Sequence, residues 1–390
     1  MSTLLVIAGF AVILIVLWDA FEAIILPRRV TRRIRLTRMF YLYTWIPLSA
    51  IARRMHSMKK RDKYLGYFGP LSLILLLSLW AVSLVFSFAV IHWALQTQLA
   101  VPAGAHAAPD TFGTYLYMSG VTFFTLGFGD VVPLGAYGRS LAVMEAGVGF
   151  GFLAMVIGYL PVLYQAFSHR EVNISLLDAR AGSPSSAGEL LRRHAECGNM
   201  KELTELLRDW ERWSAELMES HLSYPVLSYF RSQHDNQSWL SALTTILDTC
   251  AFVMAEIKDG PAWQARLTFA IARHAVVDLS QIFSIAPQPP SADRLSHEDL
   301  LRIRRVLSSL NVELRHKEEA NPRLTEFRGM YEPYVNALSQ SLLMPLPPWV
   351  VTKKKTDNWQ TSAFERKVAG SGNGSTAASL REAREDEHAF

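Results

Sequence analysis

The chain has 390 residues, of which 50% are hydrophobic and 19% charged, and its formal net charge is +4. The charges are distributed unevenly, a pattern typical of a membrane protein with a soluble appendage. The positive excess does not call for a nucleic acid partner, because the basic residues gather beside a predicted membrane span. Both cysteines, Cys197 and Cys250, fall in a region that we expect inside the cell, where thiols stay reduced. We therefore expect no structural disulfide.

Three apolar stretches are long enough to cross a hydrocarbon layer of about 30 Å as helices. They cover residues 3–26, 71–95 and 140–167. The first stretch has no basic region before it and runs directly into a basic block, so it is not expected to be a cleaved secretory signal. The sequence predicts an all-α membrane protein with three transmembrane helices, the first of them a membrane helix of the mature protein.

A basic block between residues 28 and 63 sets the predicted orientation. It contains twelve Lys and Arg residues and one acid, Asp62. Cytoplasmic segments carry such an excess, and each basic residue gains about 1 kcal/mol near anionic lipid. We expect the N-terminus outside, residues 96–138 outside, and everything after His169 inside, with anionic membrane lipid at the cytoplasmic face. The protein would be a multi-pass protein of the cell membrane, in a bacterial inner membrane.

Two acids lie near the end of the first predicted span. Asp19 and Glu22 share one face of the helix, close to the expected cytoplasmic surface. They are interpreted as partners of the adjacent arginines, with a role in an ion path as the alternative.

A segment of intermediate polarity lies between the second and third spans. Residues 111–135 are too polar and glycine-rich for another span and too apolar for an ordinary loop. Such a segment re-enters a membrane only where protein surrounds it. We predict a short helix over 111–124, extended backbone at Gly127 and Gly129, and an exit at Asp130 and Pro133.

The spacing of the glycines in this segment points to ion coordination. A ring of backbone carbonyls aimed at one axis replaces the water shell of a cation without adding fixed charge. Consecutive carbonyls face one way when alternate residues take backbone angles that glycine adopts freely. Gly127 and Gly129 have this alternate spacing, and Thr125 adds a hydroxyl oxygen at one end. The sequence predicts ion-binding backbone at Thr125, Leu126, Gly127, Phe128 and Gly129.

The motif Thr125-Leu126-Gly127-Phe128-Gly129-Asp130 resembles the filter of the potassium channel family, T-V-G-Y-G-D. The resemblance covers residues 71–167 and implies a two-helix pore domain with potassium as the permeant ion. It further implies filter support from Asp130 and from Ser119 and Thr122 on the pore helix. Phe128, Phe124 and Val121 depart from the family pattern, so the support of this filter must differ. Sodium or nonselective conduction is therefore the alternative.

The third span holds an acid and a run of glycines. Glu145 is the one acid deep in this span, and we hypothesise that it hydrogen-bonds the pore helix or the filter backbone; an interhelical contact without a conduction role is the alternative. Gly149 stands where the family has a glycine that lets the inner helix bend, with Gly147 beside it. A gating hinge at these glycines and close packing by small residues remain equal alternatives.

Beyond the third span the chain becomes charged and periodic. Helices are predicted over residues 187–217, 237–258, 261–283, 297–311 and 323–343, which together form an α-helical cytoplasmic domain. Aromatic residues at near-helical spacing are interpreted as core or subunit interface, namely Trp210, Trp213, Tyr224, Tyr229 and Phe230. The scattered histidines have no metal-ligand spacing, and no glycine-rich phosphate loop follows a strand. We expect no metal, no cofactor, no nucleic acid and no enzymatic activity.

The predicted organisation has five parts, at residues 1–27 (transmembrane helix), 28–69 (basic juxtamembrane segment), 70–168 (pore domain), 169–350 (helical cytoplasmic domain) and 351–390 (disordered tail). Because each chain supplies one filter segment and four are needed to close a filter, a homotetramer is expected. No span carries the regular arginines of a voltage sensor. A membrane sensor or scaffold with a non-conducting pore is the alternative of a different class.

Overall fold

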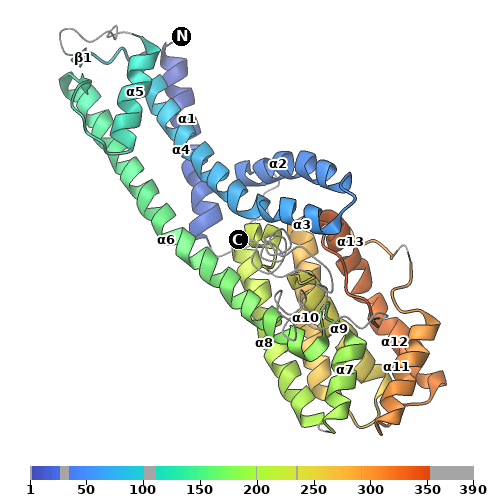
Figure 1. Ribbon diagram of the computed structural model, residues 1–390. Helices are drawn as coiled ribbons and strands as arrows, with labels where there is room; N and C mark the ends of the chain where they lie inside the picture. Colours follow the sequence, from blue (N-terminus) through green and yellow to red (C-terminus); the bar gives the residue numbers. More distant parts are fainter. Residues whose placement is uncertain are drawn as a thin grey trace, which may run out of the picture. The chain divides into compact units, whose positions relative to one another are not determined.

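The computed structural model describes residues 2–26, 35–100, 111–198, 200–233, 236–290 and 292–351. These residues form helices and one pair of two-residue strands, which confirms the predicted all-α class (Figure 1). The arginines at positions 28–33 and the predicted tail from residue 352 onward lie outside the described residues.

The chain forms two compact units. Unit 1 comprises Met1–Phe167 and Ser220–Arg231, and unit 2 comprises Ser168–Glu219 and Ser232–Phe390. The helix α6 (Gly135–Ala181) begins in unit 1 and ends in unit 2. The sequence did not predict that residues 220–231 return to unit 1, because this contact joins residues distant along the chain.

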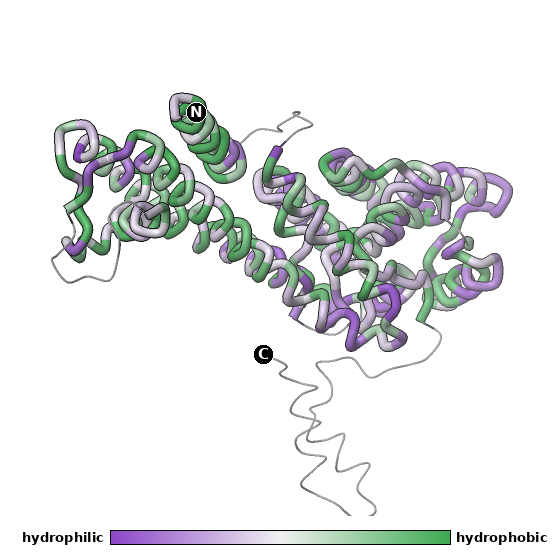
Figure 2. The backbone as a smooth tube through the Cα atoms, turned by 90° about the horizontal axis from the view of Figure 1, so that it is seen from above, coloured by the Kyte–Doolittle hydropathy of each residue, from purple (hydrophilic) through white to green (hydrophobic). Residues whose placement is uncertain are grey.

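Four helices among the described residues are long and apolar enough to cross a membrane: Ser2–Ile25, Met58–Ala94, Gly135–Ala181 and Trp239–Glu256. The first three correspond to the predicted spans, and the N-terminal helix is hydrophobic along most of its length (Figure 2). The fourth, α9, is buried along its whole length inside unit 2. A helix that protein encloses on every side serves as a core helix.

The membrane helices of unit 1 pack closely along α1 (Ser2–Ala20) and α4 (Phe68–Ala94). Gly9 allows this approach, because a Cβ added there would lie 2.6 Å from Cγ1 of Ile91. Further along, Ile13 and Val16 are buried in one cluster with Trp80 and residues of α6. Because lipid tails are as apolar as these side chains, close van der Waals packing rather than transfer from water stabilises the contact between membrane helices.

Asp19, at the end of α1, anchors the first turn of α2 (Leu36–Arg53). Its Oδ2 accepts hydrogen bonds from the backbone N of Thr37 at 3.0 Å, from Thr37 Oγ1 at 2.6 Å and from Trp80 Nε1 at 3.2 Å. A carboxylate there satisfies an unpaired N–H group and interacts favourably with the helix dipole. The predicted arginine pairing is present at Glu22, whose Oε2 lies 3.4 Å from Arg35 Nε. Among the described residues Asp19 contacts Thr37 and Trp80; the arginines at positions 28–33 lie outside these residues, so its pairing with them stays a prediction.

The basic juxtamembrane segment contains two helices, α2 and α3 (Met58–Gly66), which sequence reasoning left without structure. One face of α2 carries Tyr41 and Trp45, which pack against Phe68 at the start of α4 and against Tyr229. Tyr229 belongs to the 3₁₀ helix η2 (Pro225–Tyr229) in the returning segment. Stacked and edge-to-face rings of this kind add about 0.5–1.5 kcal/mol each to the burial of their area.

Unit 2 is a helical bundle around α9 (Trp239–Glu256), against which other helices pack. The bundle contains α7 (Ala187–Glu196), α8 (Met200–Ser223, through Glu219), α10 (Ala262–Ile282), α11 (His297–Ser309), α12 (Lys317–Gly329) and α13 (Glu332–Leu342). Trp210 and Trp213 are buried in it, as predicted. The predicted helix over 187–217 is wrong as a single helix, because Gly198, with φ +63°, ends α7 in a left-handed turn.

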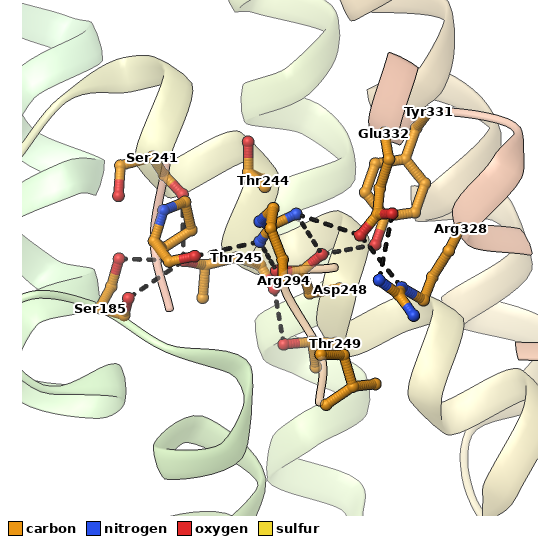
Figure 3. Close-up of polar contacts among 12 residues, drawn as sticks. Ser185, Ser241, Thr244, Thr245, Asp248, Thr249, Arg294, Arg328, Tyr331 and Glu332 are labelled. Atoms are coloured by element: carbon orange, nitrogen blue, oxygen red, sulfur yellow. Dashed lines mark hydrogen bonds and ion pairs between the residues drawn. The ribbon is translucent and has the colours of Figure 1, made fainter. Parts of the chain in front are cut away.

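A buried ionic cluster joins three parts of unit 2 (Figure 3). Arg294, in the loop between α10 and α11, contacts Asp248 on α9, with 2.5 Å between Nη2 and Oδ2. Its Nη1 lies 3.4 Å from Glu332 Oε1 on α13, and its Nη2 donates to the carbonyl of Pro347 at 3.1 Å. Asp248 is fully buried and also accepts a hydrogen bond from the Tyr331 hydroxyl.

The start of α7 leads to a prediction on acid stability. Ser186 Oγ caps the backbone N of Glu189 at 3.3 Å, and hydrogen bonds from Arg192, then from Arg193, lower the pKa of the Glu189 carboxyl from 4.5 to about 2. A lowered pKa adds stability that is present above the ordinary value and is lost as pH falls toward the native value. A Glu189→Gln variant should therefore melt below the wild type at pH 7, and the difference should narrow as pH falls to about 3. A difference that is the same across this range would contradict the prediction.

Candidate functional site

The pore helix predicted over 111–124 is present as α5 (Phe112–Phe123). The last turn continues past it through hydrogen bonds from Phe124 N to Gly120 O, Thr125 N to Thr122 O, and Leu126 N to Val121 O, at 3.1, 3.0 and 2.9 Å. Beyond Leu126 the backbone leaves the helical pattern. Ser119 is buried on the pore helix, and Thr122 is half-buried.

The backbone of the predicted ion-binding segment alternates in conformation. Thr125, Gly127 and Gly129 have φ values of +55°, +63° and +75°, while Leu126 and Phe128 between them are not among the residues with positive φ. This alternation is what allows successive carbonyls to point the same way. A Cβ at Gly127 or Gly129 would meet nothing within 4 Å, so these positions favour glycine for its conformational freedom rather than for space.

The side chains of the segment are not covered by their own chain. Leu126 is 55% exposed and Phe128 66% exposed within a single chain. Exposed apolar side chains that lie next to one another mark a surface covered by another molecule or by lipid.

The exit of the segment is held by short contacts. The Tyr117 hydroxyl on the pore helix donates to Asp130 Oδ2 at 2.7 Å, and the backbone N of Val131 donates to Asp130 Oδ1 at 3.0 Å. The strands β1 (Leu99–Ala100) and β2 (Val132–Pro133) then pair antiparallel. These contacts tie the C-terminal end of the segment to the pore helix and to the strand that follows α4.

A polar cluster lies behind the pore helix in an otherwise apolar region. Ser119 Oγ donates to Glu145 Oε1, so the predicted contact of Glu145 with the pore helix is present. Glu145 Oε2 lies 3.7 Å from Nε2 of His92 on α4, and Nδ1 of His92 lies 3.1 Å from Thr97 Oγ1. Ser119, His92 and Glu145 are all fully buried.

Gly149 makes a closer approach than the other glycines of its run. A Cβ there would lie 1.9 Å from the carbonyl oxygen of Phe123, at the end of the pore helix. Gly147 and Gly151 would meet nothing within 4 Å. The packing alternative thus has a specific contact at Gly149, and the gating hinge remains a prediction.

Sequence reasoning missed His92 and Tyr117. His92 had a usable signal, since it is an ionisable residue inside the predicted second span, and such residues are candidates by default. Tyr117 had none, because only the folded backbone brings it to Asp130. Among the described residues, no group of three or more His, Cys, Asp or Glu could hold a metal ion.

Comparison with known proteins agrees with this geometry. Residues 74–165 match the family described as "Ion channel". The two curated proteins named Protein LctB, from Bacillus caldotenax and Geobacillus stearothermophilus, are 33% and 32% identical over 84 residues, 20% of this chain and 62% of each relative. The uncharacterized membrane protein YdjJ of Bacillus subtilis (strain 168) is 24% identical over 190 residues, 47% of this chain and 52% of the relative. No solved structure matches the chain.

Residues 74–165 therefore form an ion-channel domain, in which two membrane helices flank a pore helix and an extended segment. Over this domain the chain is similar to the family described as "Ion channel", in agreement with the resemblance seen in the filter motif. The chain spans less than two thirds of the length of each curated relative.

Proposed function

We propose that the chain is a subunit of a channel that conducts potassium passively through the backbone carbonyls of residues 125–129. The observation that carries the proposal is the alternating backbone of Thr125, Gly127 and Gly129 inside an ion-channel domain. Carbonyls so arranged replace the hydration shell of a monovalent cation without a net charge that would bind it too tightly to leave.

The residues around the filter act as its support. Asp130 fixes the outer end through Tyr117, while Ser119 and Glu145 brace the pore helix from behind. Thr122 belongs to the last turn of the pore helix, where its carbonyl accepts the hydrogen bond of Thr125. Asp130 thus holds the end of the filter segment, and Glu145 holds the pore helix that leads into it.

Four copies of the chain would assemble around one filter. Each chain contributes one filter segment, and a carbonyl filter closes with four. The exposure of Leu126 and Phe128 within one chain supports this assembly, because neighbouring subunits would cover these side chains. In the resulting channel, the N-terminus lies outside the cell and unit 2 lies in the cytoplasm.

This orientation is supported by the basic residues of α2 and α3, such as Arg53 and Lys60, which are typical of the cytoplasmic face and of contact with anionic lipid. The relatives come from Bacillus and Geobacillus species, in keeping with a channel of a bacterial cell membrane.

The proposal is tested by potassium flux into liposomes that contain the full-length protein or its Gly127→Ala variant. Alanine at φ +63° costs about 1–2 kcal/mol in each subunit, and four subunits share the filter. We expect the variant to lose at least about tenfold in flux, since 1.4 kcal/mol corresponds to a factor of ten.

Gly66→Ala is the matched control, because a Cβ at Gly66 meets nothing within 4 Å and its φ is not positive. Equal flux through the wild type and the Gly127→Ala variant would disprove conduction through this segment. Reversal potentials in mixed potassium and sodium salts test the selectivity: a value near the potassium equilibrium potential is expected, and a value near zero would identify a nonselective pore.

A further inference from the structure

His92 is an ionisable side chain, fully buried on α4, to which the filter motif assigns no role. Its Nδ1 faces Thr97 Oγ1 at 3.1 Å, and its Nε2 faces Glu145 Oε2 at 3.7 Å. Among the described residues, neither His92 Nε2 nor Glu145 Oε2 has a hydrogen-bond partner. Because these two buried polar atoms face each other, we interpret them as partners.

The contacts of this pair connect three elements. Thr97 follows the end of α4, His92 lies in the last turns of α4, Glu145 lies on α6, and Ser119 lies on the pore helix α5. A line of polar contacts thus runs from the outer helix through the inner helix to the helix that carries the filter. A change at His92 reaches the pore helix through Glu145.

The number of protons on the pair decides its energy. If the pair carries no titratable proton, a carboxylate is buried beside a neutral imidazole. If it carries two, an imidazolium is buried beside a neutral acid. Each case leaves one uncompensated charge in an apolar region, at a cost of several kcal/mol. With one proton the pair is either a neutral hydrogen bond or a compensated ion pair. We propose that His92 and Glu145 share one proton, and that His92 is a positioning residue which holds Glu145 against Ser119.

Among the residues that the structure describes in the surrounding elements, no second charge competes for this role. The pore helix presents Ser119 and Tyr115, whose hydroxyl donates to the carbonyl of Thr97 at 2.9 Å. Gly9 of α1 packs against Ile91, the residue before His92, and the charged residue of α1, Asp19, lies at the other end of that helix. Arg139, one turn and a half before Glu145 on α6, is exposed. Among these residues the pair therefore has no charged neighbour that competes for its proton.

The test compares four full-length proteins: the wild type, His92→Gln, Glu145→Gln, and the variant with both changes. Glutamine donates and accepts hydrogen bonds but takes no proton, so His92→Gln leaves Glu145 as the only group that can hold one. We expect potassium flux through His92→Gln to rise at least about fivefold as pH falls from about 9 to about 5, because the buried carboxyl is tolerated only when neutral. Wild type, Glu145→Gln and the double variant should show little change over this range.

Thermal unfolding over the same pH series provides a second measurement that does not depend on conduction. The inference rests on the proposed channel function only in the flux measurement, because thermal unfolding does not require conduction. Wild-type protein that passes no potassium, with a His92→Gln melting temperature that falls toward high pH, would reject conduction and support the shared proton. Wild-type conduction, with His92→Gln as insensitive to pH as the wild type in both measurements, would overturn the shared proton and leave conduction intact.

The double variant serves as the control in case the single variant His92→Gln does not fold. If His92→Gln does not assemble but His92→Gln with Glu145→Gln does, the neutral pair has restored what the unpaired carboxyl destroyed, which supports the inference. If neither assembles, the charge of the pair is not what matters, and the inference is overturned.

Discussion

An Arg294→Ala variant is expected to lose about 3–5 kcal/mol from the stability of unit 2, which is the usual effect of removing one partner of a buried ion pair. Asp248 is fully buried, and without Arg294 its carboxylate retains the Tyr331 hydroxyl and only the longer-range attraction of Arg328 (Figure 3). The variant also loses the hydrogen bond to the Pro347 carbonyl, which attaches the segment after α13 to the bundle.

The buried thiol of Cys250, on the same helix as Asp248, reports unfolding of unit 2. In a Cys197→Ser background, where the exposed thiol is absent, the rate of Cys250 labelling at increasing denaturant gives the stability of this unit. Lys258→Ala is the matched control, because the Lys258–Glu313 pair is exposed and such pairs are worth about 0–1 kcal/mol. Equal effects of the two substitutions would contradict the prediction.

The direction in which the stability loss of Arg294→Ala changes with pH distinguishes a lost charge partner from lost packing. Burial raises the pKa of the Asp248 carboxyl, and removal of Arg294 should raise this pKa further. A raised pKa means that stability falls as pH rises above the ordinary value, so the loss in Arg294→Ala should be larger at pH 8 than at pH 5. Arg294→Met combined with Asp248→Asn should recover most of the stability, because no charge then remains buried without a partner. A pH-independent loss that the double variant does not recover would identify packing as the cause.

The alternating backbone of residues 125–129 and the apolar spans could be predicted because their information is local. Gly127 and Gly129 act through their own backbone angles, and an apolar run of sufficient length indicates a membrane helix whatever surrounds it. The pore helix was predicted to within about one residue at each end for the same reason. Glu145 was recognised because a carboxyl inside a span is costly wherever the span packs.

The remaining features depend on contacts between distant residues. Nothing near Asp19 in the sequence indicates that it anchors Thr37, and nothing near Tyr229 indicates that it packs on Tyr41 in the other part of unit 1. His92 carried a signal, but its partner is known only once α4 and α6 are side by side. The break at Gly198 was missed because the apolar periodicity continues across it, and a single glycine inside a helical pattern is often tolerated.

A Gly149→Ala variant is expected to impair assembly and ion selectivity together. The added Cβ would lie 1.9 Å from the Phe123 carbonyl oxygen and 2.7 Å from its carbonyl carbon. These are backbone atoms, so no side-chain rotation relieves the overlap, and either α6 or the end of the pore helix must shift. Overpacking of this kind costs about 1–3 kcal/mol and occasionally more. The measurements are the tetramer fraction in size-exclusion chromatography and the reversal potential in mixed potassium and sodium salts.

Gly151→Ala serves as the control, since a Cβ two residues further along the same helix meets nothing within 4 Å. Close packing and a gating hinge at Gly149 predict different changes in the Gly149→Ala variant. Close packing at Gly149 predicts loss of tetramer and of selectivity, because the end of the pore helix leads directly into Thr125. A gating hinge predicts a normal tetramer with unchanged selectivity and a lower open probability, because alanine stiffens the helix without moving the filter. Normal assembly and selectivity in Gly149→Ala would therefore reject the packing role, and a lower open probability in single-channel recordings of the same variant would assign the glycine to the movement of α6.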